Sequence, residues 1–176
     1  VGGDLKYLLG STGVAWLYVR KELLSSLFPT SGGWFTQANI FAMDIYHHTP
    51  SPSARRFEAG TPPVPSLYAA IAGLQIIGEV GLSAITAQIR ALTDTIKSSA
   101  MRRGFRLVTP VDPAQHGPLI AIRSHRVDLL AKRLEQQGII TSSRDGNLRV
   151  SPHFYNTCED VERLFTALDT QRDLLV

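Results

Sequence analysis

Three short clusters in this sequence carry side chains that could do chemistry. The first is a single lysine, Lys6, followed by a loop that contains Gly10 and Gly13 and leads into an apolar run. A primary amine on such a loop can form a Schiff base with a carbonyl cofactor when it is unprotonated. On burial statistics alone, a loop lysine is more often a solvated surface residue. The other two clusters therefore decide how Lys6 is interpreted.

The second cluster, residues 58–62, contains Gly60 and Thr61. The Thr61 hydroxyl and the main-chain N–H groups beside Gly60 could hold a phosphate, although glycine, threonine and proline in succession are also typical of a plain turn. The third cluster centres on Arg149, which alternates with apolar residues and could present two N–H donors to a carboxylate. The ordinary alternative is an arginine on the solvent-exposed face of a strand, with no binding role.

Other reactive residues give weaker signals. His47 and His48 are adjacent and point in different directions in a regular segment, so no metal site is predicted. His153 stands beside two aromatic residues and is expected to be structural. Cys158 opens an expected helix, but no general base accompanies it, and we interpret it as an incidental thiol.

Composition sets the class of protein. The chain has 176 residues, 44% hydrophobic and 19% charged, with a net charge of +3 and scattered arginines, which argues against nucleic-acid binding. The single cysteine excludes an intrachain disulfide and fits a reducing compartment. No apolar run reaches the roughly 18 residues of a membrane span, and no leader of signal-peptide type is visible. We expect a soluble cytoplasmic protein with no membrane partner.

Up to residue 65 the pattern predicts few regular elements. A strand is expected over 14–19 and a short helix over 20–27, which ends at a run containing Pro29 and two glycines. Residues 36–65 contain five prolines and little periodicity, so they are predicted to form a long irregular connection. Connections of this length are usually functional or disordered.

Two helices are expected next. Ser66 is predicted to cap a helix from 67 to about 79 that is apolar on most sides and therefore buried. A second helix over 83–103 is amphipathic and ends at Gly104. Its apolar stripe is Ile85, Ile89, Leu92, Ile96 and Ala100, and the residues expected to face away are Gln88, Arg90, Asp94 and Lys97.

The remainder, residues 105–176, is predicted to be a small α+β unit. The expected strands are 105–108, 119–122, 139–141 and 148–151, and the expected helices are 127–137 and one that Thr157 caps. The last two strands are joined through residues 144–147, in which Asp145 and Gly146 favour a tight turn.

Taken together, the clusters resemble the class V aminotransferases, a fold-type I α/β family of pyridoxal-phosphate enzymes that includes kynureninases, isopenicillin-N-epimerase-like proteins and cysteine desulfurases. The resemblance rests on Lys6-Tyr7-Leu8-x-Gly10-x-x-Gly13, on Arg56-Phe57-Glu58-x-Gly60-Thr61-Pro62, and on the run from Arg149 to Thr157. It spans nearly all of the chain in the same order and spacing.

The resemblance implies a role for each cluster. Lys6 is the lysine that forms the Schiff base with pyridoxal 5'-phosphate and moves the α-proton of an amino-acid or keto-acid substrate. Thr61, beside Gly60, reaches the phosphate of a cofactor held mainly by the other subunit, which implies a homodimer with shared active sites. Trp34 resembles a tryptophan that approaches the same phosphate in kynureninases, and Arg149 binds the substrate's α-carboxylate.

Two departures from the family pattern limit which of the family's reactions is expected. Leu5 stands where many relatives carry a histidine, and residues 142–145 contain no cysteine where group II desulfurases place one. Sulfur transfer is therefore disfavoured, and the run after Arg149 is more similar to the kynureninase and epimerase-like branch. Transamination, a kynureninase-like hydrolase or lyase reaction and epimerisation remain open, as do a non-catalytic α+β module and a phosphate-ligand binding protein.

The resemblance also implies a domain organisation. The chain corresponds to the C-terminal part of such an enzyme, because the family's cofactor-pairing aspartate, ring-stacking residue and glycine-rich phosphate loop precede the lysine and are absent here. We expect a remnant of the large cofactor domain over 1–82, a bridging helix over 83–104, and the small domain over 105–176. Alone, this piece is expected to hold cofactor weakly and to be nearly inactive.

Overall fold

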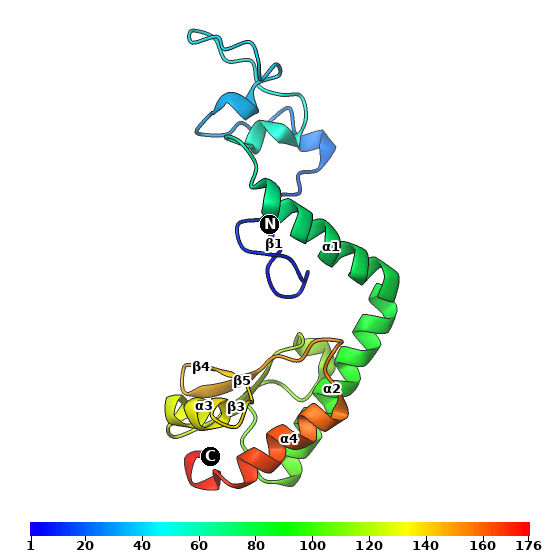
Figure 1. Cartoon of the computed structure of the whole chain (residues 1–176), viewed down its shortest axis with the longest axis vertical. Coiled ribbons are helices and arrows are strands. Elements are labelled where there is room, and N and C mark those ends of the chain that lie inside the picture. The colour runs from blue at the N-terminus through cyan, green and yellow to red at the C-terminus, as the bar shows by residue number, and fades with distance from the viewer. The chain divides into compact units, whose positions relative to one another are not determined.

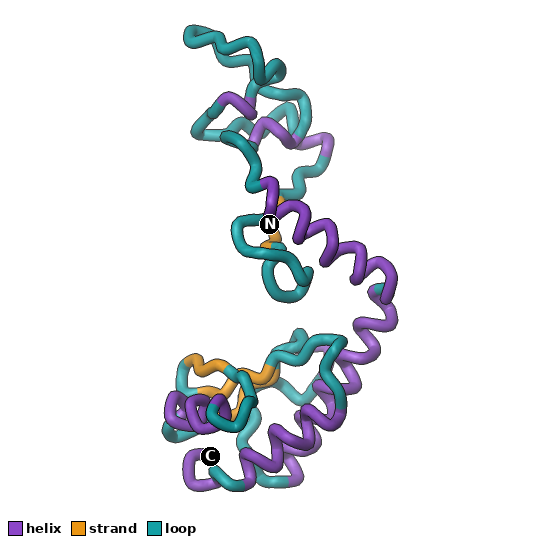
Figure 2. The backbone as a smooth tube through the Cα atoms, in the orientation of Figure 1, coloured by secondary structure: helices purple, strands orange, loops and turns teal.

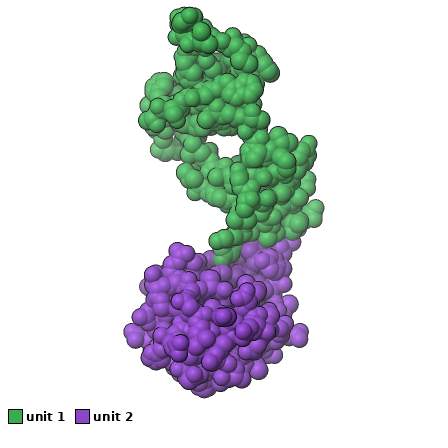
Figure 3. Space-filling model, turned by 60° about the vertical axis from the view of Figure 1, so that its left-hand side comes forward, with its two compact units in different colours: residues 1–79 green, residues 80–176 purple.

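The structure, a computed structural model, describes residues 1–176. Internal contacts divide the chain into two compact units, residues 1–79 and residues 80–176, which are coloured green and purple in Figure 3. No single helix is long and apolar enough to cross a membrane; α1 (Val64–Val80) and α2 (Leu82–Arg102) reach that length and composition only together, across a break.

Loops dominate the first unit before α1, as the teal tube in Figure 2 shows. Its strands β1 (Gly2–Gly3) and β2 (Ala15–Trp16) pair antiparallel, with Gly2 opposite Trp16. The strand predicted over 14–19 is therefore only two residues long, because only two residues of β1 pair with it. The helix predicted over 20–27 is reduced to a 3₁₀ turn. The 3₁₀ turns of this unit are Lys21–Leu23, Trp34–Thr36 and Ala54–Phe57.

Two adjacent arginines hold the irregular connection in place. The Arg56 side chain is buried, its Nε donates a hydrogen bond to the Ser51 carbonyl at 2.8 Å, and its Nη1 donates to the carbonyls of Leu24 and of Leu27, the latter at 3.1 Å. Arg55 adds two hydrogen bonds to carbonyls of the preceding loop. These bonds satisfy main-chain acceptors that neither helix nor sheet engages.

Helix α1 differs from its prediction in two ways. It begins at Val64, so Ser66 lies inside the helix instead of capping it, and prolines occupy its start, where a missing N–H costs little. The expectation of a buried helix is also wrong, since most of its apolar surface is left uncovered by the chain. The buried residues of α1 are Ala70, Gly73 and Ile77.

The second unit is a three-stranded antiparallel sheet packed against helices (Figure 1). The elements after α2 are β3 (Ile120–Arg123), α3 (Val127–Glu135), β4 (Ser142–Arg144), β5 (Asn147–Val150) and α4 (Cys158–Asp169), with 3₁₀ turns at Pro113–Gln115 and Arg172–Leu174. The strand order is β3-β5-β4, which places β5 in the centre. One apolar core joins the sheet to all three helices; it includes Leu92, Ile96, Ile120, Ile122, Leu130, Leu134, Leu148 and Phe165.

Most sequence expectations for this unit are confirmed. The apolar stripe of α2 is buried except for Ile89, which is half-buried. Gly104 adopts φ +75°, and the turn between β4 and β5 places Asp145 at φ +52° and Gly146 at φ +73°. The hydroxyl of Thr157 accepts a hydrogen bond from the Asp160 main-chain N–H, which confirms Thr157 as the predicted cap of α4 and forms one half of a capping box.

Three expectations for this unit are wrong. Residues 105–108 make only an isolated bridge, between Leu107 and Ile122, and the strand expected over 139–141 lies over 142–144 instead. Lys97 does not face away from the core but is only 3% exposed. Its aliphatic stem is covered while Nζ contacts Asp94 at 3.0 Å and the Val111 carbonyl at 2.9 Å, which makes burial tolerable. The three-part division at residues 82 and 104 stays a prediction.

Candidate functional site

The Lys6 loop, residues 4–14, is closed by main-chain hydrogen bonds. The N–H of Asp4 donates to the Val14 carbonyl at 3.1 Å, the N–H of Gly10 donates to the Asp4 carbonyl at 3.1 Å, and a turn within the loop begins at Lys6. Lys6 itself has φ +77°, a left-handed conformation that is uncommon for a residue with a side chain. Its side chain is exposed, and its amine has no partner within the chain.

Helix α1 supports this loop through Gly73. A Cβ atom at Gly73 would lie 2.4 Å from the Leu8 carbonyl oxygen and 2.9 Å from the carbonyl carbon of Leu9, so any larger residue would displace the loop. Glycine allows this close approach of helix and loop backbones. The position of the Lys6 backbone is therefore tied to α1, which begins three residues after Thr61.

One residue near Lys6, Asp4, escaped the sequence interpretation. Asp4 is fully buried, and its Oδ1 accepts a hydrogen bond from Trp16 Nε1 at 3.2 Å. The other carboxyl oxygen, Oδ2, is buried with no partner. An aspartate two positions before the lysine was a visible signal, but its burial depends on the return of the chain at Gly10, which the residue pattern does not reveal.

The Gly60–Thr61 segment offers unused hydrogen-bond donors. Neither the main-chain N–H groups of these two residues nor the Thr61 hydroxyl makes a hydrogen bond within the chain. The segment lines a groove that is also lined by residues 13–17, where the Lys6 loop ends and β2 begins. Lys6 is not among the residues that line this groove, so a single copy does not bring its amine to Thr61 there.

Trp34 lies close to the same segment. Its Nε1 is the atom nearest to the position that a Cβ at Gly60 would take, at 3.8 Å, and its ring meets Phe35 edge to face at 4.8 Å. The structure thus gathers three of the predicted cofactor contacts, Trp34, Gly60 and Thr61, in one region of the first unit.

Arg149 stands on β5, the central strand of the second unit. Its cross-strand partners are Ala121 on β3 and Ser142 on β4. Since side chains alternate along a strand, these three residues share the face opposite to the buried Leu148 and Val150. The Arg149 side chain is half-buried, and its guanidinium makes no hydrogen bond or ion pair within the chain. An unpaired guanidinium on a rigid strand is suited to bind a carboxylate.

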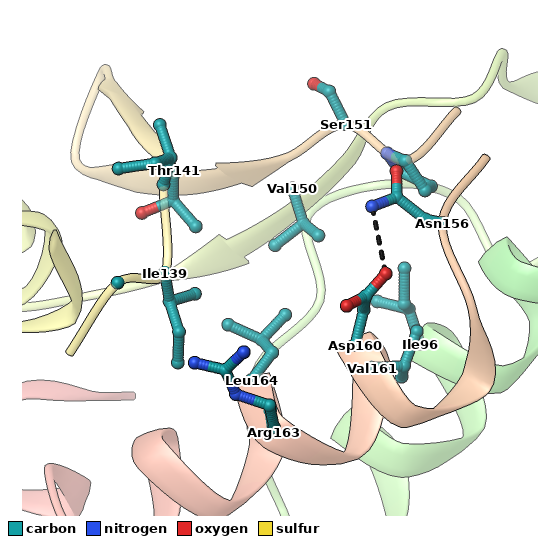
Figure 4. Close-up of a pocket in the computed structure, with 13 residues that line it drawn as sticks. Ile96, Ile139, Thr141, Val150, Ser151, Asn156, Asp160, Val161, Arg163 and Leu164 are labelled. Carbon is teal, nitrogen blue, oxygen red and sulfur yellow. Dashed lines mark hydrogen bonds between the residues drawn. The ribbon is translucent and has the colours of Figure 1, made fainter. Parts of the chain in front are cut away.

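A separate pocket of about 300 Å³ lies between the end of β5 and α4 (Figure 4). Apolar side chains line it, with Asn156, Asp160 and Arg163 among its polar residues. The main-chain N–H of Thr157, together with the Asn156 amide that donates to Oδ2 at 3.2 Å, holds the pKa of Asp160 below its ordinary value. None of the predicted site residues lines this pocket.

The histidines of the first unit are engaged in local contacts. His47 contacts Asp44 at 3.1 Å, and main-chain N–H groups of Tyr46 and His47 lower the pKa of the Asp44 carboxyl. His48 Nε2 lies 2.6 Å from the buried Thr36 hydroxyl. No group of three or more histidine, cysteine or acidic side chains could hold a metal ion.

The family model described as aminotransferase class-V matches residues 3–164. The chain is 37% identical to the uncharacterized aminotransferase YcbU of Bacillus subtilis (strain 168), over 90% of this chain and 41% of that protein. It is 34% identical to a kynureninase of Deinococcus radiodurans, over 82% of this chain and 36% of that protein.

The fold matches that of a solved apo cysteine desulfurase from Thermococcus onnurineus NA1. The TM-score is 0.86 at 22% identity, and the match covers 96% of this chain and 45% of that one. The similarity in fold confirms the predicted α/β class of fold-type I enzymes. The chain spans less than half the length of each of these relatives.

Proposed function

Because the chain belongs to the class-V aminotransferase family, we propose that it carries part of a pyridoxal-phosphate site that acts on an amino acid or its keto acid. Pyridoxal phosphate supplies an electron sink for carbanion chemistry when bound, and the protein supplies an amine, donors for the phosphate and an anchor for the substrate. The chain has a residue for each of these three tasks, so its residues fit the cofactor.

Lys6 is proposed to hold the cofactor covalently through Nζ and to move the substrate's α-proton. Its amine is exposed and unpaired, and its backbone lies near the start of a closed loop. The Thr61 hydroxyl and the N–H groups of Gly60 and Thr61 would hold the phosphate, with Trp34 beside them. Arg149 would bind the substrate carboxylate with its two parallel N–H donors.

The active sites are proposed to be shared within a homodimer. The groove along Gly60 and Thr61 does not include Lys6 of the same copy, which is compatible with donors that serve a neighbour's cofactor. A mixture of copies tests this arrangement. Lys6→Ala and Thr61→Ala chains should each be defective alone, whereas their mixture should restore cofactor attachment to the intact Lys6.

The observation that carries the proposal is that the amine, the phosphate donors and the guanidinium all lack partners within the chain. These groups are exposed or half-buried and have no partner in the chain, so a ligand can take the place of water on each of them. The 34% identity with a kynureninase favours a second candidate, in which the same residues serve a kynureninase-like hydrolase reaction.

Reductive trapping tests the proposal. Pyridoxal phosphate and cyanoborohydride are added to the chain, and digestion with mass spectrometry locates the label. Label should concentrate on Lys6 in preference to the chain's other lysines, Lys21, Lys97 and Lys132. Trapping accumulates product even when the reversible complex is weak.

A matched pair of variants gives the control. Lys132 is exposed on α3, so Lys132→Ala should leave the label on Lys6 unchanged, whereas Lys6→Ala should remove the dominant label. Inorganic phosphate should slow labelling of Lys6 but not that of Lys132. Label that spreads evenly over the exposed lysines would contradict the proposal.

A further inference from the structure

We propose that Asp4 is a positioning residue for Lys6, acting through its hydrogen bond to Trp16 and its contact with Gly10. The inference rests on the proposed function, since it concerns how the amine of Lys6 is aimed at a cofactor. Asp4 is not one of the residues proposed above to bind the cofactor or the substrate.

The Asp4 carboxyl group is buried in an unusual way. Its exposed fraction is 0%, one oxygen accepts the Trp16 indole N–H at 3.2 Å, and the other has no partner. A buried polar atom without a partner is costly, whether or not the group is ionised. Costs of this kind are found where a constraint serves a functional site.

The carboxyl group fixes both ends of the segment that carries Lys6. A Cβ at Gly10 would lie 1.5 Å from Asp4 Oδ2, so the returning chain packs directly against this oxygen. Lys6 lies between Asp4 and Gly10, and its φ of +77° is paired with a second left-handed residue, Leu9, at φ +59°. Neither residue favours this conformation, so contacts outside their own side chains must maintain it.

The Trp16 contact extends the constraint to the second strand. Trp16 pairs with Gly2 across β1 and β2 and also lines the groove that contains Gly60 and Thr61. The Asp4–Trp16 hydrogen bond therefore links the base of the Lys6 loop to the wall beside the phosphate donors. Because Asp4 is fully buried, it acts through the loop and not by touching a ligand.

The test compares four variants with the unaltered chain: Asp4→Ala, Trp16→Phe, the double variant, and Asp4→Asn. The first readout is the rate at which pyridoxal phosphate and cyanoborohydride label Lys6, with Lys132 as internal standard. In this reaction the Nζ amine adds to the aldehyde carbon with loss of one water, and hydride from cyanoborohydride reduces the resulting C=N bond to C–N. The second readout is reductive methylation of Lys6 by formaldehyde without cofactor.

Asp4→Ala and Trp16→Phe should each slow the cofactor labelling of Lys6 by about ten- to a hundredfold, because a misplacement of about 1 Å can slow a reaction by up to about a hundredfold. The double variant should be no slower than either single variant, because both remove one interaction. Asp4→Asn keeps the acceptor for Trp16 and should restore the rate. The rate of Lys6 methylation by formaldehyde should stay unchanged, since this small reagent does not need the amine to be oriented toward a bound cofactor.

Three results would overturn the inference. Labelling of Lys6 in Asp4→Ala at the unaltered rate would show that the carboxyl group does not position it. Asp4→Asn as slow as Asp4→Ala, or methylation that falls together with labelling, would indicate a general loss of folding. If Lys6 of the unaltered chain labels no faster than Lys132, the proposed function itself fails. Glu22→Ala, at an exposed acidic residue of the same unit, is the control.

Discussion

Arg56 should be the most sensitive single position in the first unit. Its side chain is only 7% exposed and donates to the carbonyls of Leu24, Leu27 and Ser51, which joins two loop segments. Hydrogen bonds from a charged donor contribute about 1.5–3 kcal/mol each, and they are not fully additive. Arg56→Ala leaves three carbonyls without their donor, and we expect a loss of ~3–5 kcal/mol in the unfolding free energy of this unit.

A lysine at position 56 should not preserve the stability that Arg56 provides. One ammonium on a flexible stem cannot supply the planar fork that reaches both segments, so Arg56→Lys should retain less than half of the lost stability. Arg20→Ala is the matched control, because Arg20 is exposed and its side chain makes no hydrogen bond or ion pair within the chain. It should change stability by less than about 0.5 kcal/mol.

Hydrogen exchange read by mass spectrometry is the appropriate assay, since it reports each unit separately. Arg56→Ala should speed exchange in peptides that cover residues 20–60, while peptides from the core around Leu148 and Ile122 keep their protection. If residues 20–60 exchange as slowly in Arg56→Ala as in the unaltered chain, the Arg56 hydrogen bonds do not stabilise this segment and the prediction is wrong. Faster exchange in both units would refute the separation of the two units.

Three further predictions follow from single contacts. Gly73→Ala should destabilise the Lys6 loop by ~2 kcal/mol because a Cβ would meet the Leu8 carbonyl, whereas Gly78→Ala on the same helix meets nothing and should be neutral or stabilising; thermal melts distinguish the two. Lys97→Met should cost about 1–3 kcal/mol in urea unfolding, since it leaves the Val111 carbonyl without its donor. Because hydrogen bonds lower the pKa of Asp160 from 3.8, its capping contribution is present above that value and is lost as pH falls through the lowered pKa; Asp160→Asn should flatten the acid limb of the melting profile.

The sequence allowed good prediction where local chemistry decides structure. The stripe of α2, the turn at Asp145 and Gly146 and the helix cap at Thr157 each depend on residues within one or two turns of chain, and all three are confirmed. Lys97 was misplaced because its burial depends on the Val111 carbonyl, which lies on a loop that the periodicity of α2 does not describe.

The candidate site shows the same limit more sharply. The positions of Lys6, Thr61 and Arg149 in the sequence identified a family, and the family is confirmed. Their roles stay predictions, and the contacts that place them were not visible in the pattern. Gly73 was counted only as part of a helix, although its missing side chain is what allows the Lys6 loop to approach α1.

The contacts around Lys6 also bear on Leu5, the residue before it, which departs from the family pattern. Leu5, which the family resemblance sets against a histidine, is 46% exposed and offers no polar group to a cofactor. The residue before it is Asp4, whose carboxyl group turns inward against Gly10 and Trp16. A polar side chain at position 5 would assist by contact, whereas Asp4 can assist only by holding the loop. If Asp4 positions Lys6 as proposed, the double variant Asp4→Ala, Leu5→His should label at Lys6 more slowly than Leu5→His alone, and reductive trapping with pyridoxal phosphate measures both rates.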